Sequence, residues 1–148
     1  MSDGDSCRLK YFEGEPEVLA EVRQMWDEIF DDPEEFADYY FTEICKQNKI
    51  LLAYKGDVLA GMIHLNPYEM QVEGKKELCY YIVGVAVKPE YREQGIMHKM
   101  MQRVLADMKK DGRAFTFLMP EREEYYESLG FEKVFHTLEL DIDIAELE

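Results

Sequence analysis

Two stretches in the first third of the chain carry apolar residues at the spacing of an amphipathic helix. The stripe of the first stretch, which follows Pro16, consists of Val18, Leu19, Val22, Met25, Trp26, Ile29 and Phe30. The stripe of the second stretch is markedly aromatic and consists of Phe36, Tyr39, Tyr40, Phe41 and Ile44. Asp32 as N-cap, Pro33 at the first helical position and Glu35 at the third predict the start of this second helix.

From residue 50 onward the apolar residues come in the short runs that are typical of strands. The runs at residues 50–54 and 58–65 are separated by Lys55-Gly56-Asp57, a polar turn that predicts a β-hairpin. Asn66-Pro67 is expected to break the second run, and residues 68–72 are expected to continue it past a bend.

The longest apolar run, residues 78–87, is interrupted only by Gly84 and is rich in Val, Ile and Tyr. Such a run predicts a strand that is covered on both faces. A glycine isolated within a strand often marks a bulge or the close approach of another backbone. Pro89 ends the strand, and residues 91–95 form a short turn before a long helix that begins at about Gly95.

The predicted long helix has an apolar stripe formed by Ile96, Met97, Met100, Met101, Val104, Leu105 and Met108. Lys109 and Lys110 fall in its last turn, where the helix dipole favours cations, and Gly112 supplies a left-handed stop. The free N–H groups at its start face the carboxyl end of the preceding strand. A helix start in that position can hold a phosphate group.

The remaining pattern completes one domain that spans residues 1–148. A first strand is expected at residues 9–12, and a strand at 114–119 follows the long helix. A short helix at 121–129, closed by Gly130, and a final strand at 131–140 end the chain. The predicted order is β-α-α-β-β-β-α-β-α-β, which indicates an α/β fold with a mixed sheet flanked by helices.

Composition supports a globular domain and argues against one class of partner. The 148 residues are 47% hydrophobic and 13% aromatic, which excludes a disordered chain. The net charge of −15 argues against nucleic acid as a partner, because binding to phosphates needs clustered Lys and Arg. The charge is compatible with a cationic substrate, although a solvated acidic surface is the favoured explanation.

Cysteine usage and the N-terminus indicate a cytoplasmic protein. Cys7, Cys45 and Cys79 are an odd, widely spaced set that predicts neither a metal site nor a disulfide, as suits a reducing compartment. Residues 1–10 are polar and lack the apolar core of a signal peptide. No stretch approaches membrane-spanning length, so no membrane partner is expected.

The residues that follow the long apolar run resemble a known family. The pattern V-x-V-x-P-x-Y-R-x-x-G-I at residues 85–96, followed by a long helix, resembles motif A of the GCN5-related N-acetyltransferases (GNAT). The sequence PEYREQGIM is most similar to the N-terminal domain of acetyltransferases of the enhanced-intracellular-survival (Eis) type. The family signature Q/R-x-x-G-x-G/A falls on Arg92, Gly95 and Met97, and Met97 departs from it because this position is usually small.

The resemblance implies the GNAT fold, with a mixed, mostly antiparallel sheet, and acetyl-CoA as co-substrate. By the same resemblance, the backbone of Val85, Ala86 and Val87 bonds the pantetheine amides. The pyrophosphate is expected on the turn that consists of Arg92, Glu93, Gln94, Gly95, Ile96, Met97 and His98. Glu93 places a negative charge beside this turn, and Met97 adds bulk there.

A second resemblance concerns the chemistry. The sequence Y-E-S-L-G-F, which begins at Tyr126, resembles the element that closes GNAT domains, where the tyrosine acts as general acid on the departing thiolate. Tyr126 is therefore the predicted catalytic residue, and Tyr125 is assigned to packing or to the pocket wall. The general base is left open between Glu77 and His64, although an isolated histidine near the end of an apolar strand is more often part of the core.

The resulting hypothesis is an acyl-CoA-dependent N-acyltransferase that moves an acetyl group to a primary amine by direct attack in a ternary complex. The alternative is a non-catalytic acyl-CoA sensor or interaction module with the same fold. In GNAT proteins the loop between the first two helices forms a wall of the acceptor site, and here residues 30–35, with Asp27 and Glu28, make it acidic. A cationic small-molecule or peptide amine is therefore expected as acceptor, and a homodimer is kept open.

Overall fold

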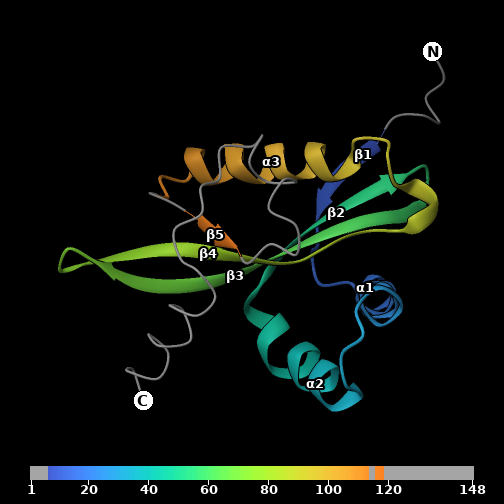
Figure 1. The fold of residues 1–148 in the computed structure, drawn as a ribbon, viewed down its shortest axis with the longest axis horizontal. Coiled ribbons are helices and arrows are strands. Elements are labelled where there is room, and N and C mark those ends of the chain that lie inside the picture. The colour runs from blue at the N-terminus through green and yellow to red at the C-terminus, as the bar shows by residue number, and fades with distance from the viewer. Residues whose placement is uncertain (1–6, 114–115, 119–148) are drawn as a thin grey trace.

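A mixed β-sheet forms the centre of the molecule (Figure 1). The computed structural model describes residues 7–113 and 116–118. Within these residues the strands lie in chain order across one sheet: β1 (Cys7–Tyr11), β2 (Lys49–Lys55), β3 (Val58–Val72), β4 (Lys75–Val87) and β5 (Thr116–Leu118). The first four strands are antiparallel to their neighbours, whereas β5 runs parallel to β4. The predicted mixed, mostly antiparallel sheet is confirmed.

Helices cover both faces of the sheet (Figure 1). Helices α1 (Pro16–Ile29) and α2 (Glu34–Tyr39) lie on one face, and α2 is followed by a π-helical turn (Tyr40–Ile44) and a 3-10 turn (Cys45–Gln47). After β4, a 3-10 turn (Pro89–Tyr91) leads into α3 (Ile96–Lys110), which covers the opposite face. The sheet is therefore the middle of three layers.

Two clusters of buried side chains hold these layers together. The α1-side cluster consists of Val22, Met25, Trp26, Ala37, Tyr40, Cys45, Ile50, Leu52, Leu59, Met62 and Ala86. The α3-side cluster consists of Leu51, Ala53, Ala60, Ile63, Leu65, Ile82, Ile96, Met100, Met101, Val104 and Met108. Consecutive residues of β2 alternate between the clusters, because successive side chains of a strand point to opposite faces. This two-sided burial explains why β2 reads as an unbroken apolar run.

The start of α2 differs from the prediction. Its N-cap is Pro33 and its first residue is Glu34, so Asp32 does not cap the helix. The Asp32 carboxylate instead accepts a hydrogen bond from the indole Nε1 of Trp26 at 3.0 Å. Phe36 and Tyr39 of the predicted apolar stripe are 49% and 57% exposed. The π-helical turn after α2 changes the helical register, and it is Tyr40 that enters the core.

Strand β3 passes through Pro67 without the predicted break. Pairing between β2 and β3 ends at Lys49 opposite Leu65, so one edge of β3 has no partner beyond that point among the described residues. A proline is tolerated in an edge segment, because its missing N–H is not needed there. Pairing with β4 continues to Val72 opposite Lys75, and β4 therefore begins at Lys75 rather than at residue 78.

The outer parts of β3 and β4 form a two-stranded ribbon that extends past the rest of the sheet (Figure 1). Residues 68–72 and 75–79, which pair with one another, make up this segment, which we call the distal ribbon. Its outer residues are largely exposed, and its sequence therefore lacks the apolar run that reveals the inner strands.

Some predicted features lie outside the described residues, namely the helix at 121–129, the strand at 131–140 and Tyr126. The predicted strand at 114–119 is present as β5. In the part of the chain that the structure describes, no helix is both long and apolar enough to cross a membrane.

Candidate active site

Strand β4 has a bulge at Gly84, as its isolated glycine predicted. Met62 of β3 lies opposite Ala86, whereas His64 lies opposite Val83. Two steps along β3 therefore correspond to three steps along β4, which places one extra residue in β4 at this point. A bulge of this kind bends the strand and redirects the neighbouring backbone groups.

Only glycine fits at the bulge. Gly84 has a φ of +62°, in the left-handed region that residues with a side chain rarely adopt. A Cβ atom at this position would lie 2.7 Å from Cζ3 of Trp26 and 2.8 Å from Cδ2 of His64. Both the backbone conformation and the close packing therefore require a glycine.

A hydrogen-bonded network is buried beside the bulge. Asn48 Nδ2 donates to the Tyr40 hydroxyl at 2.9 Å, and the Tyr40 hydroxyl lies 2.8 Å from Nδ1 of His64. Because the Asn48 amide already donates to the hydroxyl oxygen, the Tyr40 proton is free to point at Nδ1. The imidazole proton then sits on Nε2, which lies 3.3 Å from the sulfur of Met62.

This network excludes His64 as the general base. His64 is 0% exposed, and burial lowers its pKa from 6.5 to about 3. A base must reach the proton that it removes, and a group with so low a pKa is a weak acceptor at neutral pH. Glu77, the other candidate, lies seven residues before Gly84 on β4, a separation of about 23 Å along a strand. Neither candidate is placed to act at the bulge.

Trp26 connects the bulge to the loop between α1 and α2. Its ring stacks on Tyr40 with 4.7 Å between ring centroids and meets His64 edge-on at 5.2 Å. Its Nε1 donates to Asp32 in the loop. One side chain thus contacts the bulged strand through its ring and fixes the loop through its N–H.

The turn between β4 and α3 contains two residues in the left-handed conformation. Glu93 has a φ of +63° and Gly95, the N-cap of α3, a φ of +77°. The first hydrogen bond of the helix joins the Lys99 N–H to the Gly95 carbonyl at 3.0 Å, so the N–H groups of residues 96–98 have no helical partner. A Cβ at Gly95 would meet no atom within 4 Å, and the space beside the turn is therefore open.

Side chains on either side of the turn fix its position. Arg92 Nε donates to the Val87 carbonyl at 2.9 Å, which joins the turn to the end of β4. Ile96 is 3% exposed within the α3-side cluster, and Met97 packs against the same cluster. The bulk of Met97 is thus accommodated by the core, while Glu93 is exposed.

The predicted pantetheine-binding residues lie at the end of β4, immediately before this turn. Ala86 belongs to the α1-side cluster, whereas Val85 and Val87 pack against the α3-side cluster. Within the described residues, pairing of β4 with β5 ends at Ile82 opposite Leu118. Alternate backbone groups beyond that pair point away from β3. The structure thus brings both predicted cofactor-binding segments to one end of β4.

The acidic loop carries less free charge than the sequence suggested. Arg23 pairs with Asp27 at 3.1 Å and with Asp38 at 2.9 Å, which compensates Asp27 and links α1 to α2. Glu28 accepts a hydrogen bond from its neighbour on α1, Gln24. Asp31 has no ion pair with any described residue. Gln24 is neutral and does not compensate the charge of Glu28, so the expected surplus of negative charge at the loop is reduced to Glu28 and Asp31.

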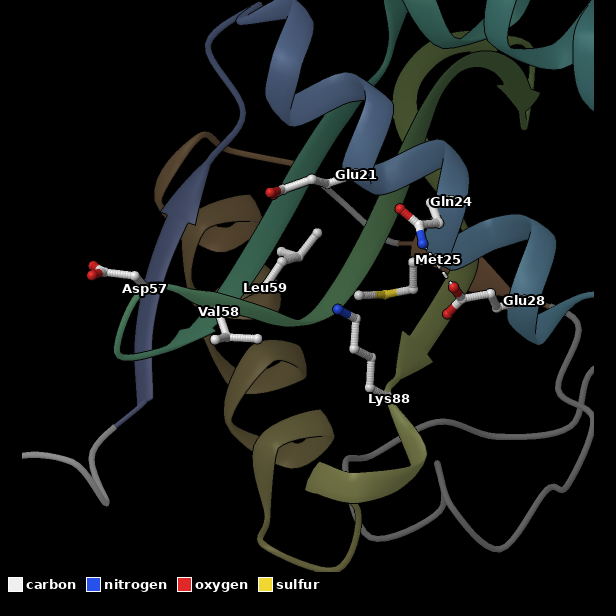
Figure 2. Close-up of a pocket in the computed structure, with 8 residues that line it drawn as sticks. All are labelled: Glu21, Gln24, Met25, Glu28, Asp57, Val58, Leu59 and Lys88. Carbon is white, nitrogen blue, oxygen red and sulfur yellow. Dashed lines mark hydrogen bonds between the residues drawn. The ribbon is translucent and has the colours of Figure 1, made fainter.

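A hollow of about 230 Å³ lies between α1 and the β2–β3 turn (Figure 2). Glu21, Glu28 and Asp57 contribute carboxylates to its lining, and Lys88 extends into it from the end of β4 toward Met25 (Figure 2). Its volume is below the roughly 300 Å³ at which ligand pockets begin. Three carboxylates around one ammonium also disfavour a phosphate. This hollow therefore does not suit a nucleotide cofactor.

Two of the three cysteines, Cys45 and Cys79, are not suited to act as nucleophiles. All three are free thiols, and Cys45 and Cys79 are buried. Burial raises the pKa of Cys45 to about 11 and also raises the pKa of Cys79. These two thiols are therefore protonated at neutral pH and are poor nucleophiles. Among the described residues, no His, Cys, Asp and Glu side chains gather in a group that could hold a metal ion.

Sequence reasoning missed the residues that support the bulge. Trp26 and Tyr40 were recognised only as members of apolar stripes, and Asn48 was not singled out. The one available signal was the excess of aromatic residues in the second stripe. It indicated that the rings pack, but it did not show which residues they pack against. The pairing of Asn48 with Tyr40 depends on the turns after α2, which the apolar pattern does not encode.

Comparison with known proteins identifies the family. The model of the acetyltransferase (GNAT) domain family matches residues 13–134. The chain therefore belongs to the GNAT acetyltransferase family, and its fold is the GNAT fold. None of the curated proteins matches the chain.

Solved structures with the same fold include enzymes of several kinds. A probable N-acyltransferase from Enterococcus faecalis V583 matches with a TM-score of 0.79 and 23% identity over 88% of this chain and 33% of that protein. This chain thus spans about a third of that longer protein. A predicted acetyltransferase from Clostridium acetobutylicum, solved with acetyl-CoA, matches with a TM-score of 0.67 and 16% identity, covering 87% and 92% of the two chains. An aminoglycoside antibiotic 6'-N-acetyltransferase from Acinetobacter haemolyticus matches with a TM-score of 0.69 and 16% identity, covering 88% and 94%.

Proposed function

We propose that the protein is an acyl-CoA-dependent N-acyltransferase that transfers an acetyl group from acetyl-CoA to a primary amine by direct attack in a ternary complex. The observation that carries this proposal is the turn at the start of α3, where Glu93 and Gly95 are left-handed and three N–H groups lack a helical partner. The acetyl-CoA complex of the Clostridium acetobutylicum neighbour supports the choice of co-substrate. Acetyl-CoA supplies the acyl group as an activated thioester.

The residues at the turn suit the phosphates of that co-substrate. Backbone N–H groups at a helix start attract an anion through both hydrogen bonds and the helix dipole. The open space beside Gly95 lets a phosphate approach the backbone closely. A residue other than glycine in the left-handed conformation, such as Glu93, marks strain of the kind that is found at binding sites. We assign the phosphates to the turn at residues 92–98 and the pantetheine arm to residues 85–87.

The chain's own groups then have the following roles. Backbone N–H groups near residues 85–87 stabilise the negative charge that develops on the carbonyl oxygen. Tyr126 donates a hydrogen bond or a proton to the departing thiolate, for which a phenol is available because its ordinary pKa of about 10 keeps it protonated at neutral pH. Direct transfer is favoured over a covalent intermediate, since Cys45 and Cys79 are buried and protonated.

A sensor that binds acyl-CoA without transferring the acyl group is the second candidate. One observation favours it: neither of the two residues that the sequence suggested as base can act at the bulge. His64 is buried and neutral. Glu77 lies about 23 Å away along β4. An enzyme would need to deprotonate its amine through another group or through water.

The acceptor class is a further part of the proposal. A net charge of −15 favours a cationic amine, and the similarity to an aminoglycoside 6'-N-acetyltransferase supports this choice. We also propose a relation to the Eis type, which rests on the resemblance of the sequence PEYREQGIM. The cytoplasmic location and the homodimer remain predictions.

Release of free thiol from acetyl-CoA, measured across a panel of primary amines, tests the proposal directly. Thiol release that depends on both protein and amine supports the enzyme. Acetyl-CoA binding by calorimetry without amine-dependent thiol release would support the sensor instead. Absence of binding at millimolar acetyl-CoA would contradict both.

A further inference from the structure

Three aromatic rings lie together on the sheet where the distal ribbon begins. Tyr81 of β4 and Phe117 of β5 are stacked, with 4.9 Å between ring centroids and 9° between their planes. Tyr68 of β3 meets both rings nearly edge-on, at 6.0 Å from Tyr81 and 5.8 Å from Phe117. We call these three residues the aromatic platform. Three neighbouring strands each contribute one ring, so the sheet itself fixes their arrangement.

The platform lies on the same face of the sheet as the bulge at Gly84. Tyr68 lies opposite Cys79, and two residues along each strand bring Asn66 opposite Tyr81. Residues directly opposite each other share a face, and so do residues two apart along a strand. Tyr68 and Tyr81 therefore share the face of His64, which contacts Gly84. This is the face that α1 and α2 cover further along the sheet.

One side of the platform is open to solvent at Tyr68, whereas Tyr81 and Phe117 are partly buried. Tyr68 is 46% exposed, and its neighbour on the ribbon, Met70, is 37% exposed. A cluster of rings that packs against one another and still faces solvent is a feature of interaction sites more than of an ordinary surface. Burial, together with the neighbouring Tyr68, raises the pKa of Tyr81, so its phenol is neutral at physiological pH.

Polar groups around the platform select the charge of its ligand. Glu77 lies opposite Met70, on the platform face, and has no ion pair with any described residue. On the other face of the ribbon, by contrast, Glu69 pairs with Lys76 at 3.4 Å. The buried Oδ1 of Asn66, opposite Tyr81, has no hydrogen-bond donor among the described residues. Ring faces, a free carboxylate and an unpaired carbonyl oxygen all favour a cation.

We propose that the aromatic platform is a subsite for a second cationic group of the acceptor, so that the preferred substrates are diamines or polyamines rather than monoamines. This inference rests on the proposed function, because it assumes that the reacting amine lies at the bulge. Tyr81 is three residues before Gly84 on β4, which corresponds to about 10 Å along the strand. The second cation of the acceptor therefore lies about 10 Å from the reacting nitrogen.

Two probes with equal carbon chains test the subsite, namely α,ω-diaminooctane and n-octylamine. The extended diamine is long enough to place one nitrogen at the bulge and the other on the platform, whereas octylamine has only the reacting nitrogen. A cation held on aromatic faces should make the diamine bind roughly 3- to 30-fold more tightly. Binding is measured by calorimetry on protein saturated with acetyl-CoA, and KM is measured from thiol release.

Matched variants separate the platform from the rest of the ribbon. Tyr68→Leu should abolish the preference for the diamine, whereas Tyr68→Phe, which keeps the ring, should retain it. Leu78 is 54% exposed on the other face of the ribbon, and Leu78→Ala should leave the preference unchanged. Glu77→Gln should weaken diamine binding more than Glu69→Gln does. Thermal unfolding checks that every variant is folded.

The outcomes distinguish this inference from the proposed function. If no amine releases thiol but the diamine still binds in a Tyr68-dependent manner, the subsite stands and the enzyme does not. Equal affinities for the two probes would overturn the subsite even if both amines are acetylated. Equal reductions of diamine binding in Leu78→Ala and Tyr68→Leu would also overturn the subsite. A dimer in sedimentation that Tyr68→Leu dissociates would overturn it too, because the platform would then be a contact between two copies.

Discussion

A single methyl group added at Gly84 tests whether the bulge is fixed by close packing. In Gly84→Ala the new Cβ would lie 2.7 Å from Cζ3 of Trp26 and 2.8 Å from Cδ2 of His64. Real Cβ atoms do not approach other atoms so closely, so at least one ring must move. Trp26 stacks on Tyr40 and its N–H is bonded to Asp32, so the displacement is opposed by several contacts.

The magnitude follows from two contributions. An alanine held in the left-handed conformation costs roughly 1–2 kcal/mol. Overpacking of a well-filled core costs roughly 1–3 kcal/mol more. The free energy of unfolding should therefore fall by about 2–5 kcal/mol, a large part of the ~5–15 kcal/mol of a typical domain. For a chain of this length the melting temperature should fall by roughly 4–20 °C.

Urea unfolding of the variant beside a matched control measures this effect. Gly56 in the β2–β3 turn has a φ of +63°, and a Cβ there would meet no atom within 4 Å. Gly56→Ala should thus lose only the conformational contribution, about 1–2 kcal/mol. The excess loss in Gly84→Ala reports the packing at the bulge. Equal losses in the two variants would refute the reasoning.

Two further predictions concern the proposed acid and the buried histidine. Tyr126→Phe should lower kcat by roughly 10²–10⁴-fold while the affinity for acetyl-CoA is retained. Tyr125→Phe should change kcat much less. If steady-state kinetics show similar small effects for both variants, Tyr126 is a packing residue. The pKa of His64 is about 3 in the folded state, whereas in the unfolded state it has its ordinary value of 6.5. As the pH falls, the unfolded state therefore binds a proton before the folded state does. Stability is therefore fully present above pH ~6.5, is lost progressively toward pH ~3, and should be about 2 kcal/mol lower at pH 5 than at neutral pH. His64→Gln should lack this contribution in urea unfolding at the two pH values, and an unchanged pH dependence would contradict the assignment.

The sequence predicted those parts of the fold that depend on burial on both faces. The two inner strands of the first hairpin, the stripe of α3 and the glycine at the bulge each leave a mark on the apolar pattern. The distal ribbon leaves none, because its exposed residues need not be apolar. The effect of Pro67 was also predicted wrongly. Whether a proline breaks a strand depends on which neighbour is present at that position, and the sequence does not record this.

The candidate site was only partly predictable. The start of α3 next to Gly95 was predicted correctly, since glycine and the start of a long helix are local signals, whereas the phosphate-binding role of residues 92–98 stays a prediction. Asp32 was misassigned as a cap, because its partner Trp26 lies on the preceding helix and competes for the carboxylate. The aromatic platform combines Tyr68, Tyr81 and Phe117 from three strands, and no spacing in the sequence brings these residues together.

The central claim, that the turn before α3 holds the phosphates of acetyl-CoA, is tested most directly by the thermal shift of two isosteric variants. Ligand at a hundred times its Kd adds about 2.7 kcal/mol to stability. The wild-type protein should therefore melt roughly 5–11 °C higher with acetyl-CoA. Gly95→Asn, which tolerates the left-handed conformation and adds no charge, should keep most of this shift, as should the control Gly56→Asp. Gly95→Asp should lose it, because its carboxylate repels the phosphates. No shift in the wild-type protein, or equal shifts in Gly95→Asp and Gly95→Asn, would contradict the account.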